Sequence, residues 1–211
     1  MGATSSAGGT GPTKDYERAE GGVYPGRCVH VIELGTHDNT YQGETKQRKE
    51  LMIVWEINEL MEDGRPFTVY WRGTNSLNDK AKLYKHLCDW RGGAFTPDEL
   101  NMFELKNILD QTCLINITLE KTKNDRPFNR VQSIMSLPKG TDVNDRHNPL
   151  VDFGISDLGT EEFEKLWPWV QKIVKESYEG IQFYASEAPM NTPEDGNNTG
   201  SGQESLVKPP F

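Results

Sequence analysis

The side chains of this sequence that could do chemistry are cations and aromatic rings, and they gather in three stretches. These stretches are residues 41–48, residues 67–73 (FTVYWRG) and residues 121–130. Cations follow the phosphates of a nucleic acid, and aromatic rings stack on unpaired bases at ~1–3 kcal/mol per base. Each residue alone is better explained as a solvated charge or as a ring at the rim of a core, and only their collection favours a binding surface. The candidate residues are Tyr41, Lys46, Arg48, Tyr70, Arg72, Lys121, Lys123, Arg126, Phe128 and Arg130.

Residues 46–57 (KQRKELMIVWEI) predict the strand around which these stretches are arranged. Every second residue of its later part is apolar, and this set consists of Leu51, Ile53, Trp55 and Ile57. Period-two alternation places successive side chains on opposite faces of a strand. One face is therefore a predicted core wall, which makes Trp55 a core residue and not a stacking ring. The other face begins with Lys46 and Arg48 and then turns apolar, so we expect a nucleic acid to cross only its first half.

The order of elements along the chain predicts a mainly β fold. Five strands are predicted, at residues 23–34, 46–57, 67–73, 112–121 and 127–137, the last with a bulge near Ser133. Helical signals stand between the third and fourth strands: a capping-box pattern begins at Ser76, and Thr96-Pro97 opens a second short helix. This order is typical of a five-stranded OB-fold Greek-key barrel with a helical insertion between strands 3 and 4. An SH3-like barrel or a small sandwich is the alternative, although neither needs helices at that place.

An OB barrel would bring the candidate residues together. Its binding surface lies across strands two and three and is flanked by the loops after strands one and four. Tyr70 and Arg72 fall on the third strand and Lys46 and Arg48 on the second. Tyr41 falls in one of these loops, and the other holds Lys121, Lys123 and Arg126. Phe128 and Arg130 continue the set along the fifth strand.

The remaining sequence divides into appendages of the predicted DNA-binding domain at residues 21–140. Residues 1–20 are expected to be a flexible arm, and residues 185–211 a disordered acidic tail that ends in Pro-Pro-Phe. Residues 141–184 are expected to be a linker followed by a C-terminal helix at 160–177 that packs on the barrel and is kinked at Pro168. Its apolar stripe consists of Phe163, Leu166, Trp167, Val170, Ile173 and Val174.

Net charge, cysteine spacing and hydropathy limit the classes of function. The net charge is −9, but residues 1–140 hold 18 Lys and Arg against 19 Asp and Glu, whereas residues 141–211 hold 5 against 13. The excess acid therefore lies in the last third, and the first two thirds can carry a basic face. No apolar run approaches 18 residues and no secretory signal is seen, so we expect no membrane association. The three cysteines lack the spacing of a zinc site or a disulfide framework, and no metal or other cofactor is expected.

Enzyme signatures are absent from the sequence. It contains no P-loop, no GxSxG and no HExxH. The carboxylates Glu50, Glu56, Asp63 and Glu120 leave a metal-dependent nuclease open as a minor alternative.

Several blocks in order resemble phage-encoded OB-fold single-stranded-DNA-binding replication proteins. The blocks include GVYPGRCVHVIELGT, QRKELMIVWEIN, DGRPFTVYWRGTNSL, LYKHLCDWRGGAFT, FELKNILDQTCLINI and SIMSLPKG, and the resemblance covers residues 20 to 180. It implies coating of single-stranded DNA in the host cytoplasm during phage replication or recombination, without catalysis.

The tail is similar in kind to the acidic, Phe-terminated tails through which such proteins recruit replication and repair partners. The resemblance implies that Pro209, Pro210 and Phe211 contact a phage or host replication protein. From its composition alone, an acidic flexible tail with an aromatic end can also fold back over a basic groove and compete with DNA. The tail departs from the pattern because it is sparsely acidic and carries Lys208. An OB-fold protein–protein adaptor of the phage replisome is the alternative function.

Overall fold

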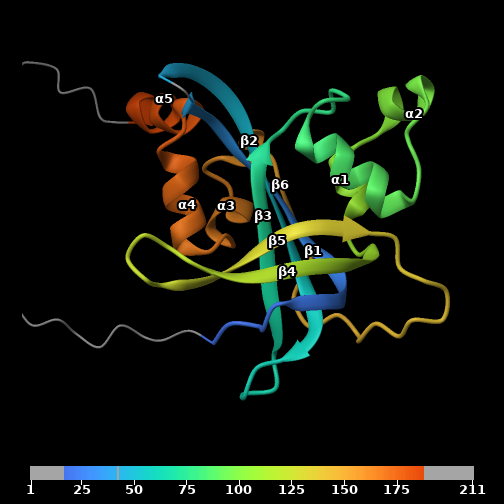
Figure 1. Ribbon diagram of the computed structural model, residues 1–211. Coiled ribbons are helices and arrows are strands. Elements are labelled where there is room, and N and C mark those ends of the chain that lie inside the picture. The colour runs from blue at the N-terminus through green and yellow to red at the C-terminus, as the bar shows by residue number, and fades with distance from the viewer. Residues whose placement is uncertain (1–16, 42, 188–211) are drawn as a thin grey trace, which may run out of the picture.

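The computed structural model describes residues 17–41 and 43–187, and its main element is an open antiparallel sheet (Figure 1). Its strands are β1 (Gly22–Tyr41), β2 (Glu44–Leu60), β3 (Pro66–Thr74), β4 (Thr112–Lys121), β5 (Pro127–Met135) and the short β6 (Val151–Phe153). They follow the order β3-β2-β1-β4-β5, and β6 adds to β1 in parallel. The predicted mainly β class is confirmed. The sheet is not closed, because no hydrogen-bonded ladder among the described residues joins β3 to β5, although the two strands contact each other.

Strand β1 is the centre of the sheet because it pairs with three other strands. Residues 22–27 pair with β4, residues 26–41 pair with β2, and residues 30–32 pair with β6. A Cβ added to Gly26 would lie 2.8 Å from the Ile115 side chain and 2.9 Å from the Glu56 carbonyl oxygen, so only glycine fits between the neighbouring strands.

The β1–β2 hairpin is longer than the sequence predicted. The sequence predicts strands at 23–34 and 46–57 with a polar connection at 35–45 between them, but residues 35–41 are strand residues because β2 provides a ladder partner for each of them. Register shifts after Cys28 and Glu33 bend β1, and Gly35 (φ +83°) follows the second one.

The central parts of strands β1 and β2 are buried on both faces. Residues 51–57 of β2 are all buried, including Trp55, which is 0% exposed as predicted. The first core covers one face and contains Cys28, Val31, Leu51, Ile53, Trp55, Ile57, Val69, Trp71, Ile115, Ile117 and Val131 among others. The second core covers the opposite face and contains Val29, Ile32, Leu34, Met52, Val54, Val151, Phe153, Phe163, Leu166, Val170 and Val174 among others.

Helical segments between β3 and β4 cover the first core. They are α1 (Lys82–Arg91), α2 (Pro97–Met102) and the 3-10 helix η1 (Leu105–Ile108). The predicted capping box at Ser76 is wrong, because its hydroxyl accepts a hydrogen bond from the Asn78 amide in a turn and α1 begins only at Lys82. Thr96 does begin α2 with a capping box.

C-terminal helices cover the second core, on the left-hand side of Figure 1. They are η2 (Ile155–Asp157), α3 (Glu161–Glu164), α4 (Pro168–Lys175) and α5 (Tyr178–Glu187). The helix predicted at 160–177 is interrupted, because Trp167 has a non-helical backbone (φ −57°, ψ 142°) and Pro168 begins α4 as its first residue. Helix α5 bonds to the β1–β2 hairpin: the Thr36 amide and hydroxyl donate to the Glu179 carboxylate at 2.7 and 2.6 Å.

Three predicted boundaries differ from the structure. Residues 151–153, inside the predicted linker, form β6. Residues 185–187, inside the predicted tail, belong to α5, and residues 188–211 lie outside the described part. Ala19, inside the predicted arm, is buried in the first core, and its carbonyl accepts a hydrogen bond from the Asn129 side-chain Nδ2 atom.

We expect Phe163→Ala to lower the free energy of unfolding by about 3–5 kcal/mol, because this fully buried ring fills the second core. Urea unfolding of the full chain measures the change. Glu164→Ala, an exposed position on the same short helix, is the control and should stay within about 0.5 kcal/mol of wild type. Equal losses in the two variants would contradict the placement of the second core.

Candidate nucleic-acid interface

The candidate residues of the β1–β2 hairpin lie where it extends beyond the rest of the sheet. Tyr41 ends β1 opposite Glu44, and its side chain is outside the described part. Lys46 and Arg48 are exposed. The Lys46 ammonium lies 2.9 Å from the Glu44 carboxylate, whereas the Arg48 side chain forms no hydrogen bond or ion pair with any described residue.

Tyr70 and Arg72 share the outer face of β3, the face opposite the first core. Tyr70 pairs across the strands with Val54, and Arg72 with Met52. The Arg72 Nε atom donates to the Glu50 carboxylate at 2.6 Å, so this cation is partly neutralised. The Tyr70 ring is left 44% exposed.

The β4–β5 hairpin carries the largest group of candidates. Lys121 is paired with Asp125 at 2.9 Å, and Arg130 is paired with Glu120 at 2.7 Å. The Arg130 guanidinium also lies 5.6 Å from the centre of the half-buried Phe128 ring. Lys123 and Arg126 are exposed at the turn, and their side chains bond to no described residue.

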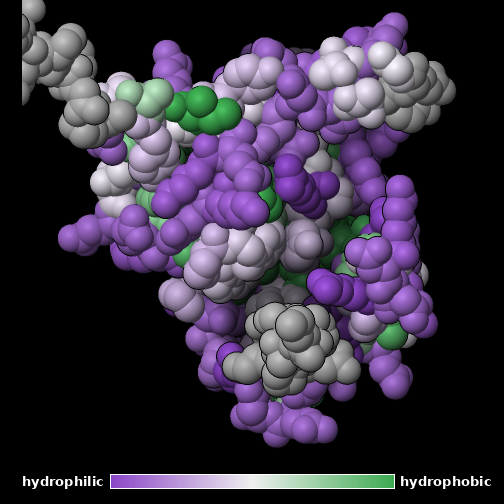
Figure 2. All heavy atoms as spheres, turned by 90° about the vertical axis from the view of Figure 1, so that its left-hand side faces the viewer, coloured by the Kyte–Doolittle hydropathy of each residue, from purple (hydrophilic) through white to green (hydrophobic). Residues whose placement is uncertain are grey.

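The candidates do not form one continuous patch. Both hairpins project toward the same side of the sheet, with α4 and α5 between them (Figure 1). The surface on that side is mostly hydrophilic, with small hydrophobic areas (Figure 2). The structure thus places two cationic hairpin tips on one side of the molecule, with the C-terminal helices between them.

Trp167 and Trp169 are aromatic neighbours of this surface that were not predicted as site residues. Trp169, at the start of α4, lies 5.4 Å from Tyr70 between ring centres. Trp167 stacks on Trp169 at 5.9 Å and 14°, and it also contacts His30 at 4.9 Å. A sequence signal existed for Trp169, because it falls outside the apolar stripe of its helix and so has no place in the core.

His30 lies beneath the tryptophans, where burial disfavours the charged form of its ring. Burial lowers its pKa below the ordinary 6.5, against smaller opposite effects of a Pro149 backbone hydrogen bond and the Glu56 charge. Its Nε2 atom is buried without a hydrogen-bond partner. Its environment therefore works against a positive charge at this place.

The carboxylates considered for a nuclease site lie apart and have other partners. Glu50 binds Arg72, Asp63 binds Arg65, and Glu120 binds Arg130. Within residues 17–41 and 43–187, no three His, Cys, Asp or Glu side chains are grouped to hold a metal ion.

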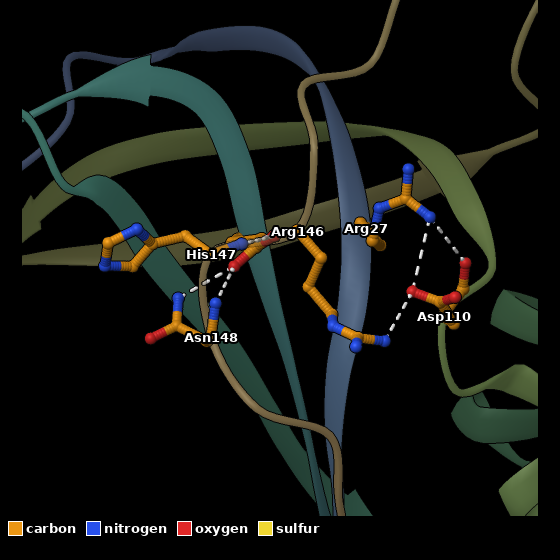
Figure 3. A network of polar contacts seen from close by, with 6 residues as sticks. Arg27, Asp110, Arg146, His147 and Asn148 are labelled. Carbon is orange, nitrogen blue, oxygen red and sulfur yellow. Dashed lines mark hydrogen bonds and ion pairs between the residues drawn. The ribbon is translucent and has the colours of Figure 1, made fainter.

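Glu56, the fourth carboxylate, fixes the loop that leads to β6 (Figure 3). It is 5% exposed and accepts hydrogen bonds from the His147 amide at 3.0 Å and from the Asn148 amide and side chain at 2.9 and 2.8 Å. Next to this contact, Arg146 and Arg27 both donate to Asp110. The network positions the loop and leaves Glu56 no free oxygen for other chemistry.

We expect Glu56→Ala to lower the free energy of unfolding by about 2–4 kcal/mol, because the partly buried His147 and Asn148 backbone amides and the Asn148 side chain lose a charged acceptor. Thermal or urea unfolding measures it. Glu59→Ala, an exposed carboxylate on the same strand, should cost at most about 0.5 kcal/mol. A loss no larger than that of the control would show that the network does not hold the loop.

Residues Pro209, Pro210 and Phe211 of the predicted partner-binding tail lie outside the described residues. Among the described helices, none is both long and apolar enough to cross a membrane. No family model, curated protein or solved structure matches the chain.

Proposed function

We propose that this protein binds single-stranded DNA without sequence preference through an OB-type arrangement of its strands. The pairing of β1 with both β2 and β4, with helices between β3 and β4, supports that arrangement. The resemblance to phage replication proteins supports a role in phage DNA replication or recombination in the host cytoplasm. Recruitment of replication partners through residues 209–211 belongs to the same proposal.

The observation that carries the proposal is the placement of unpaired cations on two hairpins that project to one side. Arg48 on one hairpin and Lys123 and Arg126 on the other have no carboxylate partner among the described residues. Exposed cations without partners are available to phosphates. Lys121 and Arg130 must first break their ion pairs with Asp125 and Glu120 before they can bind a phosphate. Tyr70 adds an exposed ring on the neighbouring strand β3, where it pairs with Val54 of β2.

Binding to oligo-dT should weaken steeply with salt, because cations that contact phosphates release counterions. Replacing two phosphate contacts by Lys123→Ala with Arg126→Ala should weaken binding and reduce the slope of log K against log salt by about 1.4. Fluorescence anisotropy of labelled oligo-dT over a salt series measures both quantities.

The matched control removes two exposed lysines near α1, Lys80→Ala with Lys85→Ala. It has the same change in net charge and should keep the wild-type slope. No detectable binding of oligo-dT by the wild type would refute the proposed function, and equal slopes in the two double variants would remove the β4–β5 turn from the site.

A further inference from the structure

An aromatic row crosses from the sheet to the C-terminal helices at the outer face of β3. It runs His30, Trp167, Trp169, Tyr70, with ring centres 4.9, 5.9 and 5.4 Å apart. Its inner end is buried at His30 (7% exposed), and its outer end is open at Trp169 (42%) and Tyr70 (44%). The stacked inner rings hold the outer ones in place.

The exposure of Trp169 is not explained by packing. Trp55, Trp71 and Trp90 are 0%, 6% and 8% exposed, so the three tryptophans of the first core are buried. On α4 the core positions belong to Val170 and Val174, which are fully buried. Trp169 instead lies beside another half-exposed ring, and adjacent exposed aromatic faces indicate a binding surface.

Cations border the two exposed rings on both sides. Arg72 lies two residues from Tyr70 on the same face of β3, and Arg48 lies on the corresponding face of β2, beyond Glu50. On α4, Lys172 follows Trp169 by one turn. Glu50 and, at 3.8 Å, Glu176 offset Arg72 and Lys172 in part, and Arg48 has no such partner among the described residues.

We propose that Tyr70 and Trp169 form a stacking platform for the unpaired bases of single-stranded DNA, built jointly by β3 and helix α4. This proposal rests on the proposed function, and it specifies where the bases of the bound DNA would lie. Stacking rings with flanking cations fit a chain that presents free base faces and phosphates together. In a duplex the base faces are already stacked on one another, so the platform discriminates against double strands.

The test compares oligo-dT with an abasic oligonucleotide of the same length, which keeps the phosphates and lacks the bases. Trp169→Ala and Tyr70→Ala should each raise the Kd for oligo-dT roughly tenfold and leave the Kd for the abasic strand unchanged. Trp169→Phe retains a ring and should stay near wild type. Met102→Ala, an exposed apolar position on α2, is the control and should have no effect.

Tryptophan fluorescence gives a second measurement on the same full-length proteins. Oligo-dT should quench the wild type, and most of that quenching should be lost in Trp169→Ala, because three of the other tryptophans are buried. Circular dichroism verifies that each variant is folded.

Unchanged oligo-dT affinity in both alanine variants would overturn the platform and leave the proposed function standing. An equal loss of affinity for the abasic strand would also overturn it, because the rings would then act without bases. Failure of the wild type to bind oligo-dT would overturn the proposed function and the platform together.

Discussion

The burial of β1 and β2 on both faces is the constraint on which the rest of the structure depends. A strand with apolar side chains on both sides is stable only when each side is covered. The first core uses the helices between β3 and β4 as its cover, and the second core uses the C-terminal helices. Helix α4 is held by Val170 and Val174, and this contact fixes Trp169 beside Tyr70. The exposed rings are therefore positioned by a core that lies beneath them.

Burial on both faces of β2 also determines where its charged side chains can lie. Glu56 lies at the end of the doubly buried part of β2, where an unpaired carboxylate would be costly. Its bonds to the backbone at 147 and 148 satisfy it and direct the chain toward β6. Nearer the start of β2, outside the second core, the same face carries Lys46 and Arg48 in solvent. One strand thus changes from a core element to a cationic surface over a few residues.

Local patterns in the sequence predicted where the strands lie better than they predicted which distant elements pair with the strands or cover them. Alternation identified β2 and the burial of Trp55, and Pro168 marked the helix break. The pattern could not tell that Met52 and Val54 would be covered by helices more than a hundred residues later. Residues 35–41 looked like a loop because their polar composition says nothing of the ladder partner that β2 supplies. The Tyr70–Trp169 contact could not be predicted for the same reason, since it joins distant parts of the chain that only the folded sheet brings together.

The second core also sets the order in which the chain can complete its fold during synthesis. Strands β1 and β2 are neighbours in sequence and can pair as soon as both have been made, but Phe163, Val170 and Val174 are translated much later. At about 5–20 residues per second, some 6–23 s separate Ile57 from Val174 on the ribosome. During that interval the Ile32, Met52 and Val54 side of the hairpin has no cover. The nascent chain is therefore most prone to aggregation before its last helices emerge, and chaperones that bind apolar strands would act on this hairpin.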